Sequence, residues 1–247
     1  MKSDQIFDGL ADKFAANIYG TTKGRLRHQL LCEALEPWLP ETPARILEIG
    51  GGTGVMAHFL AQHGHNVVLT DASEDVLVHA KELLSDTAGV TIRHARLQDS
   101  HDIHRYDMLV CHAVLEWLDN PMEAIAFMAG EMQKGSLLSL SFFNRDALLF
   151  GNALYGNFDY IEQGMQVKKK VRLNPHNPLP VQPVIEACEQ AGLTVRAKTG
   201  IRCFHDYLKD RDMQTSHYEQ LLALERTHNQ RHPYLWLGKY FHLMLEK

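Results

Sequence analysis

One stretch of the chain combines glycines with an acidic residue in a pattern suited to binding a nucleotide-like ligand. The apolar run 45–49 includes Glu48, four glycines follow with Thr53 among them, and a helical pattern begins at Val55. Glycine has no Cβ, so its backbone can take positive φ and a ligand can lie directly against it. The free amides at the start of the next helix then face that ligand. The stretch therefore predicts a buried strand, a tight turn and a helix that together form a binding loop.

The glycine positions distinguish between two kinds of ligand. Dinucleotide-binding loops prefer G-x-G-x-x-G, but here Val55 occupies the third glycine position. The glycines stand instead at Gly50, Gly52 and Gly54, and Glu48 precedes the first of them by two residues. This spacing resembles motif I of the class I S-adenosylmethionine-dependent methyltransferases, whose cofactor has no pyrophosphate. A tight turn with a purely structural role is the alternative.

A second acid supports the cofactor-binding interpretation. The run Val67–Thr70 reads as a short buried strand, and Asp71 follows it, roughly twenty residues beyond the first turn. An acid at this place accepts hydrogen bonds from both hydroxyls of an adenosine ribose. The alternative is that Asp71 caps the helix beginning near Ser73. We expect Asp71 to hold a ribose.

The alternation of patterns along the chain predicts the elements that position these residues. Strands alternate with helices, which is typical of a doubly wound parallel sheet with right-handed crossovers. We expect strands at 45–49, 66–70, 90–95, 106–111, 136–143, 193–199 and 239–245, and helices at 53–63, 73–84, 120–132, 181–191 and 214–229. Two helical patterns within 1–38 predict an N-terminal helical cap. Resemblance to the methyltransferase class implies an α/β fold with a mostly parallel seven-stranded sheet of order 3-2-1-4-5-7-6.

Composition fits a single enzyme domain spanning 1–247. A chain of 247 residues can bury a substantial core. Its apolar runs fall short of the roughly 18 residues that span a bilayer, and residues 1–12 lack the core of a secretory signal. Four scattered cysteines suit a reducing compartment and argue against structural zinc. We therefore expect a cytoplasmic protein without a membrane or metal partner, in which nucleic acid would need a local basic patch because the net charge is −5.

Further positions are expected to line the cofactor. Arg27, in the second helical pattern, has a rigid fork that suits the methionine carboxylate, although a solvated basic face is an equal alternative. In this fold the loop after the third strand meets the adenine, so Gln98 can bond the exocyclic amine and the Leu97 amide a ring nitrogen. His112 ends the fourth strand, and ligands of open α/β sheets gather at the carboxyl ends of strands. We expect His112 beside the cofactor.

An inserted segment, 145–178, combines aromatic and basic residues. Gly156–Tyr160 contains two aromatic residues, and four cations follow within five residues, namely Lys168, Lys169, Lys170 and Arg172. Such a run could contact phosphates while the aromatic rings stack on a base. A solvated loop is the alternative.

Blocks outside the cofactor motifs resemble those of the bacterial tRNA 5-carboxymethoxyuridine methyltransferase family, essentially from Phe7 to the last strand. The blocks are Asn17–Gly24, His112–Trp117, Gly156–Tyr160, Lys168–Lys170, Lys198–Gly200 and Phe204–Leu208. The resemblance implies transfer of a methyl group from S-adenosylmethionine to the carboxylate of 5-carboxymethoxyuridine in the anticodon loop of tRNA, at the wobble position. It also implies a cofactor site formed by Arg27, Gly50, Gly51, Asp71, Leu97, Gln98 and His112. The sequence departs from the family pattern at Glu48, where Asp is common.

The implied reaction needs positioning more than side-chain chemistry. A carboxylate with a pKa near 4 is already ionised at pH 7 and needs no general base. Its attack on a sulfonium removes two opposite charges, which a dry site favours. We expect no catalytic nucleophile, and Arg202 and Tyr19 are hypotheses for the groups that hold the acceptor carboxylate. A carboxyl methyltransferase for a small acid and a non-catalytic S-adenosylmethionine-binding module are the rival functions.

Overall fold

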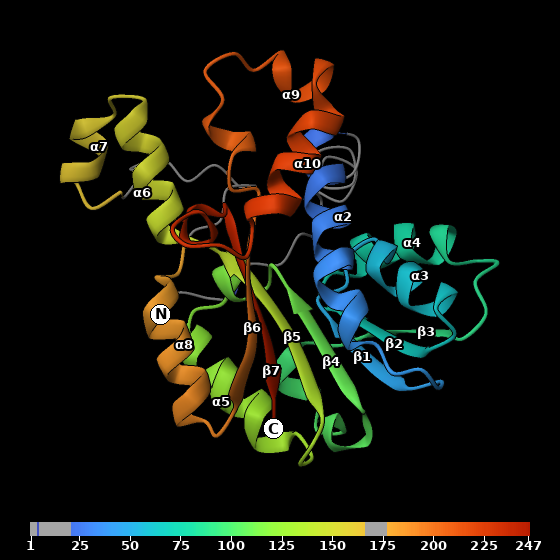
Figure 1. Ribbon diagram of the computed structural model, residues 1–247. Coiled ribbons are helices and arrows are strands. Elements are labelled where there is room, and N and C mark those ends of the chain that lie inside the picture. Colours follow the sequence, from blue (N-terminus) through green and yellow to red (C-terminus); the bar gives the residue numbers. More distant parts are fainter. Residues whose placement is uncertain (1–3, 5–20, 166–176) are drawn as a thin grey trace.

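The computed structural model describes residue 4 and residues 21–165 and 177–247, and its centre is a seven-stranded sheet (Figure 1). The sheet has the order β3-β2-β1-β4-β5-β7-β6. Strands β1 to β5 run parallel, and β7 is antiparallel to both of its neighbours, β5 and β6. The bounds are β1 (Arg45–Ile49), β2 (Asn66–Asp71), β3 (Val90–His94), β4 (Met108–His112), β5 (Leu137–Phe143), β6 (Thr194–Ile201) and β7 (Tyr240–Glu246). The predicted fold class and strand order are confirmed.

Helices cover both faces of this sheet. Their bounds are α2 (Thr22–Leu35), α3 (Val55–Gln62), α4 (Glu74–Leu83), α5 (Pro121–Glu131), α6 (Arg145–Leu154), α7 (Phe158–Glu162), α8 (Val181–Gln190), α9 (Met213–Ser216) and α10 (Tyr218–His228). Buried side chains of α2, α3, α4 and α10 share one core with the sheet, and those of α5 and α8 share the other. Figure 1 shows α5 and α8 together beside the sheet, away from α3 and α4.

Alternation along the central strands explains the two cores. In β1, Leu47 and Ile49 face the α5–α8 core, whereas Ile46 faces the core under α2 and α3. In β4, Leu109 faces the α5–α8 core, and Val110 faces the core under α2 and α3. Successive side chains of a strand point to opposite faces, and a parallel sheet buries both faces. The carboxyl ends of β1, β2, β4 and β5 are thereby fixed at one edge of a rigid sheet.

Several element boundaries differ from the predicted ones for local reasons. The expected helix 214–229 is interrupted at His217, whose φ of −120° is not helical, so α9 and α10 are separate. The expected strand 106–111 begins later, because the Tyr106 amide closes a 3-10 turn by donating to the Ile103 carbonyl at 3.1 Å. The inserted segment begins with α6, whose first turn is capped by the Asn144 side chain. The first helix of the expected N-terminal pair lies outside the described residues, and α2 is the second.

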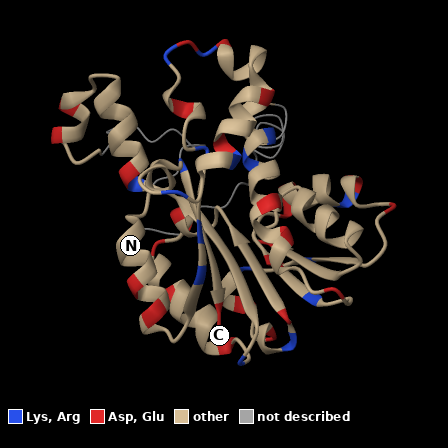
Figure 2. Ribbon diagram, in the orientation of Figure 1, with Lys and Arg blue, Asp and Glu red and all other residues tan. Residues whose placement is uncertain are grey.

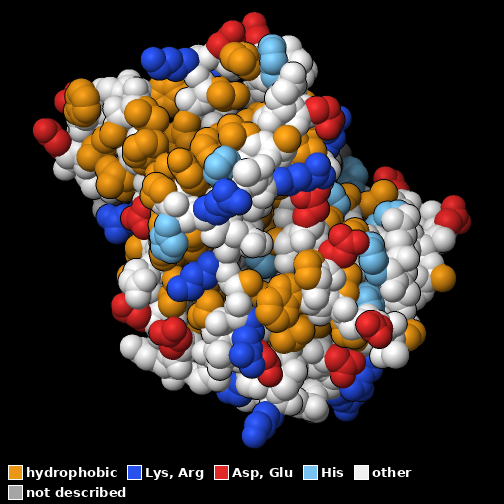
Figure 3. Space-filling view, in the orientation of Figure 1, with side chains coloured by type: hydrophobic (Ala, Val, Ile, Leu, Met, Phe, Trp, Pro, Cys, Tyr) orange, Lys and Arg blue, Asp and Glu red, His pale blue; other side chains and the backbone are white. Residues whose placement is uncertain are grey.

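An apolar area lies on the described surface at α6 and α7. Exposed side chains on α6 and α7 form it, and Figure 3 shows hydrophobic side chains gathered over these two helices at the upper left. Figure 2 shows Lys, Arg, Asp and Glu positions distributed over the whole ribbon, with acidic positions on α6 and α7 as well. Among the described helices, we find no segment with the length and apolar character needed to cross a membrane.

Candidate functional site

The glycine-rich loop after β1 has the tight geometry predicted for a binding loop. Gly50 has a φ of +65°, and a Cβ added there would lie 2.4 Å from Cγ2 of Val114. A Cβ on Gly51 would lie 2.7 Å from Cγ of Leu69. Both positions therefore exclude larger residues, for conformational reasons at the first and for lack of space at both. The loop leaves β1 at the carboxyl edge of the sheet and leads directly into α3.

Asp71 connects this loop with the end of β2. Its Oδ2 accepts a hydrogen bond from the Gly52 amide at 3.0 Å, and its Oδ1 accepts one from the Ser73 amide at 2.8 Å. Burial raises the pKa of Asp71, although these two amides oppose the shift. Because a carboxylate has about four lone-pair sites, Asp71 retains capacity for two hydroxyl donors. The cap of α4 is Ser73 itself, whose side chain accepts from the Val76 amide.

Glu48 lies beneath the same loop as a buried acid. A Cβ on Gly51 would be 2.9 Å from Cδ of Glu48, and Oε2 of Glu48 has no hydrogen-bond partner within residues 21–165 and 177–247. Burial raises the pKa of Glu48 to about 8, and the nearby Asp71 carboxylate adds to the shift. A positively charged ligand on the loop would lower both pKa values, because opposite charges favour the ionised form. The two acids thus suit a cationic ligand with a sugar diol.

Removing the charge of Glu48 should change how stability depends on pH. Its folded-state pKa is about 8, above an unfolded value of about 4.3, so the stability it contributes is fully present below pH ~4.3 and lost as pH rises toward 8. Each unit of this shift corresponds to about 1.4 kcal/mol. Relative to wild type, Glu48→Gln should therefore gain stability by several kcal/mol between pH 5 and pH 8.5.

Urea unfolding of the ligand-free protein at these two pH values measures that change. Glu82→Gln is the matched control, because this α4 acid has a side chain that is 73% exposed. Parallel pH profiles for wild type and Glu48→Gln would contradict the assignment of a buried, neutral Glu48.

His112 belongs to a buried chain of polar groups that crosses three strands. Its Nε2 lies 2.7 Å from the Ser139 hydroxyl, which lies 2.8 Å from Nε2 of His242. Burial lowers the pKa of His112 well below its ordinary value and that of His242 to about 4. Both rings are therefore neutral at pH 7, and the hydroxyl can donate to one and accept from the other. This chain fixes the orientation of His112 at the end of β4. The Nδ1 atom of His112 is buried and has no partner in the part of the chain that the structure describes.

The loop after β3 occupies the place expected for an adenine-binding loop. Leu97 and Gln98 form a 3-10 turn, Leu97–Asp99, in which Leu97 is buried and Gln98 is exposed. The Gln98 side-chain amide donates to Asp4 at 3.0 Å, and Asp4 also accepts from the Asp119 amide at 2.9 Å. Asp4 thus connects the loops that follow β3 and β4.

Arg27 is directed toward the sheet edge rather than along a solvated face. It is half-buried on α2, and its Cζ lies 5.0 Å from the centroid of the Tyr240 ring. Nearby, Glu116 is buried in the turn Leu115–Trp117, and neither of its carboxylate oxygens has a hydrogen-bond partner of full geometry among the described residues. Burial raises the pKa of Glu116 to about 7, although the backbone amides of Glu116 and Phe143 and the charge of Arg27 oppose the shift. The neighbouring Arg25 is exposed, and its Cζ lies instead 3.7 Å from the centroid of the Tyr218 ring.

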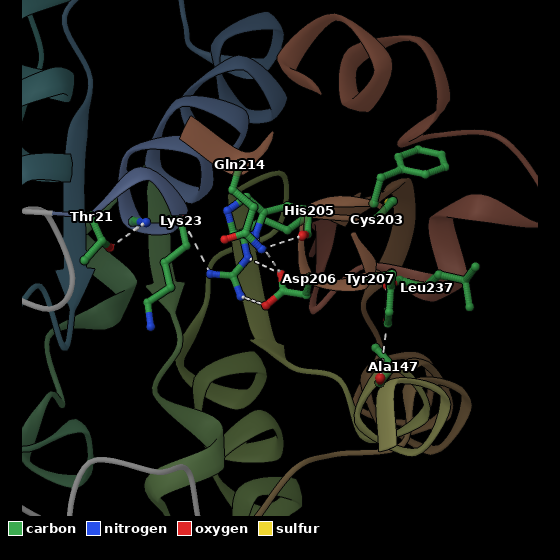
Figure 4. Close-up of polar contacts among 12 residues, drawn as sticks. Thr21, Lys23, Ala147, Cys203, His205, Asp206, Tyr207, Gln214 and Leu237 are labelled. Carbon is green, nitrogen blue, oxygen red and sulfur yellow. Dashed lines mark hydrogen bonds and ion pairs between the residues drawn. The ribbon is translucent and has the colours of Figure 1, made fainter. Parts of the chain in front are cut away.

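The guanidinium of Arg202 is paired with Asp206, four residues further along the chain. Its Nε and Nη2 both donate to the Asp206 carboxylate at 2.8 Å, and Figure 4 shows Asp206 between Lys23 and Tyr207. Arg202 is 7% exposed and has a φ of +64°. Burial disfavours the charge of Asp206, but Arg202 and His205 hold the pKa of that carboxyl well below its usual range. The fork therefore joins β6 to the following turn and has little capacity left for an acceptor carboxylate.

The other expected substrate contacts cannot be placed in the site. Tyr19, Lys168, Lys169, Lys170 and Arg172 all lie outside the described residues. Over residues 21–165 and 177–247, no three His, Cys, Asp or Glu side chains converge as a metal site would require.

Three polar residues of this edge, Glu116, Ser139 and His242, were not predicted as site residues from the sequence. The only local signal was polar residues, Ser139 and Ser141, at alternate positions of an otherwise apolar strand. In the described structure, the glycine loop, Asp71, Gln98, His112 and Arg27 all come from elements that end or pack at one edge of the sheet. A loop without room for Cβ atoms, two acids with raised pKa values and an uncommitted His112 Nδ1 fit a nucleoside that carries positive charge.

Comparison with known proteins gives matches over most of the chain. Residues 24–198 match the family model described as a methyltransferase domain. The tRNA 5-carboxymethoxyuridine methyltransferase of Escherichia coli (strain K12) is 40% identical over 253 residues, which covers 99% of this chain and 97% of that protein. The malonyl-[acyl-carrier protein] O-methyltransferase of Anoxybacillus flavithermus is 27% identical and covers 65% of this chain and 59% of that protein.

Solved structures share the fold at low sequence identity. The magnesium protoporphyrin IX methyltransferase of Synechocystis PCC 6803, crystallised with bound S-adenosylhomocysteine (SAH), has a TM-score of 0.67 and 16% identity. The match covers 98% of this chain and 96% of that one. An S-adenosylmethionine-dependent methyltransferase from Mesorhizobium loti has a TM-score of 0.59 and 17% identity, and the match covers 93% of this chain and all of that one.

Proposed function

Because this chain belongs to the tRNA 5-carboxymethoxyuridine methyltransferase family, we propose that it transfers a methyl group from S-adenosylmethionine to the carboxylate of 5-carboxymethoxyuridine at the tRNA wobble position. The product is the methyl ester, 5-methoxycarbonylmethoxyuridine. The observation that carries this proposal is 40% identity over 99% of the chain to a relative of that name. Such a protein would work in the cytoplasm, where tRNA is modified in bacteria.

The residues at the sheet edge would hold the cofactor as follows. Asp71 has lone pairs available for the ribose hydroxyls, and Leu97 and Gln98 occupy the turn that would meet the adenine. Gly50 and Gly51 would let the methionine portion lie against the backbone, and Arg27, half-buried beside Tyr240, would meet its carboxylate. His112 at the end of β4 would lie beside the cofactor, and its Nδ1 has no hydrogen-bond partner among the described residues. When bound, S-adenosylmethionine supplies a methyl group on a positively charged sulfur.

The buried groups of the site support catalysis by positioning. An acceptor carboxylate is ionised at pH 7 without a base, and neutral His112 would not compete for its charge. The buried surroundings of His112 and Glu116 favour a reaction in which opposite charges are lost, because attraction between them is stronger away from water. Alignment of the reacting atoms then accounts for most of the rate.

The exposed face of α6 and α7 is the surface on which we place the anticodon loop. Phe158 and Tyr155 are 62% and 51% exposed, and Phe150 is 39% exposed. Arg211 lies 5.6 Å from the Tyr155 ring centroid, which adds a cation beside an aromatic surface. Aromatic rings stack on unpaired bases, and cations contact the adjoining phosphates. The basic run Lys168–Lys170 follows α7 in the sequence.

Replacing Phe158 by Ala should weaken tRNA binding by about 5- to 100-fold, because stacking of one base on an aromatic ring contributes about 1–3 kcal/mol. Fluorescence anisotropy with an anticodon stem-loop at one fixed salt concentration measures the dissociation constant. Val78→Ala is the control, since Val78 is 49% exposed on α4, outside this face. Equal dissociation constants for both variants would remove α6 and α7 from the RNA surface.

Transfer of labelled methyl groups distinguishes the proposed function from its rivals. The protein is incubated with methyl-labelled S-adenosylmethionine and, separately, with tRNA containing 5-carboxymethoxyuridine, the same tRNA without this modification, and a panel of small carboxylic acids. We expect label only in the modified tRNA, with rates that fall as salt rises. Label in a small acid would favour the small-acid enzyme, and binding of the cofactor without any transfer would favour the non-catalytic module.

A further inference from the structure

Lys239 occupies a rigid position at the carboxyl edge of the sheet. It directly precedes β7, and its amide donates to the Arg202 carbonyl at 3.2 Å. Its own carbonyl accepts from the Asn144 amide at 3.1 Å, so the backbone is held between the ends of β5 and β6. Three residues further on, His242 belongs to the buried chain that orients His112. Lys239 therefore lies at the same edge of the sheet as the proposed cofactor site. It is further out along that edge than His112.

The ammonium group of Lys239 has donors to spare. The side chain is half-buried, and its Nζ lies 5.0 Å from the centroid of the Phe143 ring. Within the described part of the chain, this ammonium makes no hydrogen bond or ion pair. Burial lowers the pKa of Lys239, Asp206 opposes the shift, and Arg202 adds to it. A partly desolvated ammonium with three donors is destabilised until an anion meets it.

The surroundings make this place favourable for an anion. The guanidinium carbons of Arg27 and Arg202 lie 5.0 and 5.8 Å from the centroid of the Tyr240 ring, next to Lys239. Asp206 already neutralises Arg202 through two hydrogen bonds. Inside the described structure, the charge of Lys239 has no carboxylate paired with it.

We propose that Lys239 binds the carboxylate of the acceptor nucleoside and makes the enzyme select tRNA that carries it. This inference rests on the function proposed above and assigns to Lys239 the role that the sequence analysis considered for Arg202. An ammonium is a point donor, whereas a guanidinium fork engages both oxygens of a carboxylate. One oxygen on Lys239 leaves the other free to form the bond to the methyl carbon as the carbon–sulfur bond breaks, with its electron pair going to sulfur. No proton moves in that step.

Discrimination between two tRNAs measures the role of Lys239 directly. With S-adenosylhomocysteine present to prevent turnover, dissociation constants are determined for tRNA containing 5-carboxymethoxyuridine and for the same tRNA with uridine at that position. We expect wild type to prefer the modified tRNA by about tenfold or more, the range of one charge-assisted hydrogen bond. Lys239→Met should abolish this preference and leave binding of the unmodified tRNA unchanged, whereas Lys239→Arg should retain part of it.

Controls separate this role from a structural one. Lys198→Met removes an exposed lysine of β6 and should leave both dissociation constants unchanged, and binding of S-adenosylhomocysteine should be equal in all variants. If Lys239→Met does not fold, Lys239→Gln provides the same comparison. Equal binding of the two tRNAs by wild type, or a preference that survives in Lys239→Met or Lys239→Gln, would overturn the inference. Failure of wild type to methylate the modified tRNA would instead overturn the proposed function.

Discussion

Replacing Asp71 by Asn is expected to weaken binding of S-adenosylmethionine by about 100-fold or more. The variant keeps the size of the side chain but loses the charge that would accept from two ribose hydroxyls, and hydrogen bonds to charged groups contribute about 1.5–3 kcal/mol each. The asparagine NH₂ group must also face the amide of Gly52 or of Ser73, both of which now donate to the carboxylate. Calorimetric titration of the variant with S-adenosylmethionine measures the loss.

S-adenosylhomocysteine provides a second ligand for the same comparison. It has the same ribose but an uncharged sulfur, so Asp71→Asn should weaken the binding of S-adenosylhomocysteine by a similar factor. Asp86→Asn, at an exposed position after α4, is the matched control. A tenfold change in a dissociation constant corresponds to about 1.4 kcal/mol. If the dissociation constants of both ligands change by less than about threefold, Asp71 only organises the glycine loop.

Replacing Asp206 by Ala should destabilise the fold by about 3–5 kcal/mol, because removing one partner leaves a buried charge uncompensated. Arg202, 7% exposed, would lose both of its 2.8 Å hydrogen bonds to the carboxylate. The pKa of Asp206 lies well below its usual range in the folded protein. The pair therefore stabilises wild type above the unfolded pKa of about 3.9, and this contribution is lost as pH falls through the folded value. Urea unfolding at pH 7 measures the difference.

An exposed ion pair on the same sheet supplies the control for Asp206→Ala. Arg196 and Glu246 are 2.6 Å apart, with side chains 47% and 33% exposed. Such pairs contribute about 0–1 kcal/mol, so Glu246→Ala should have a small effect. The double variant Arg202→Met, Asp206→Ala should recover part of the stability lost in Asp206→Ala. Near wild-type stability of Asp206→Ala together with lost tRNA methylation would instead favour a substrate role for Arg202.

The parts of the molecule that follow local rules were predictable from sequence. The apolar run 45–49 and the glycines after it have one structural solution, a buried strand with a tight turn, because Gly50 needs positive φ and Gly51 has no room for a Cβ. Strand–helix alternation then limits the order of the parallel strands. Asp71 was predictable for the same reason, since the end of β2 must lie beside the loop after β1 in a parallel pair.

The side-chain partners at the site depend on contacts between distant parts of the chain. Ser139 and His242 are 103 residues apart, and nothing near either of them in the sequence indicates that they meet. Arg202 had the residue type expected of a carboxylate holder, but only the turn after β6 brings Asp206 onto its fork. No sequence pattern distinguishes Lys239. Its notable feature is structural, since its ammonium at the sheet edge has no paired anion among the described residues.

Some boundaries were missed because a single residue changes the local geometry. The apolar periodicity of the inserted segment 145–178 does not predict a helix. Helix α6 forms there with Asn144 as its cap, since the Asn144 side chain accepts from the amides of Asp146 and Ala147. The same Asn144 side chain donates to the carbonyls of Trp236 and Gly238, so this cap is also a tertiary contact. Helix α6 is therefore fixed by a residue whose partners lie about 90 residues away.

The chemical stability of the transferred methyl group tests the central claim most directly. After incubation of the protein with methyl-labelled S-adenosylmethionine and tRNA containing 5-carboxymethoxyuridine, the tRNA is purified, treated with mild alkali and digested to nucleosides. If the acceptor is the carboxylate, the label leaves as methanol and the wobble nucleoside returns to 5-carboxymethoxyuridine, because alkali hydrolyses a methyl ester. Label that survives alkali on a nucleoside, and hence sits on a nitrogen or an ether oxygen, would contradict the account.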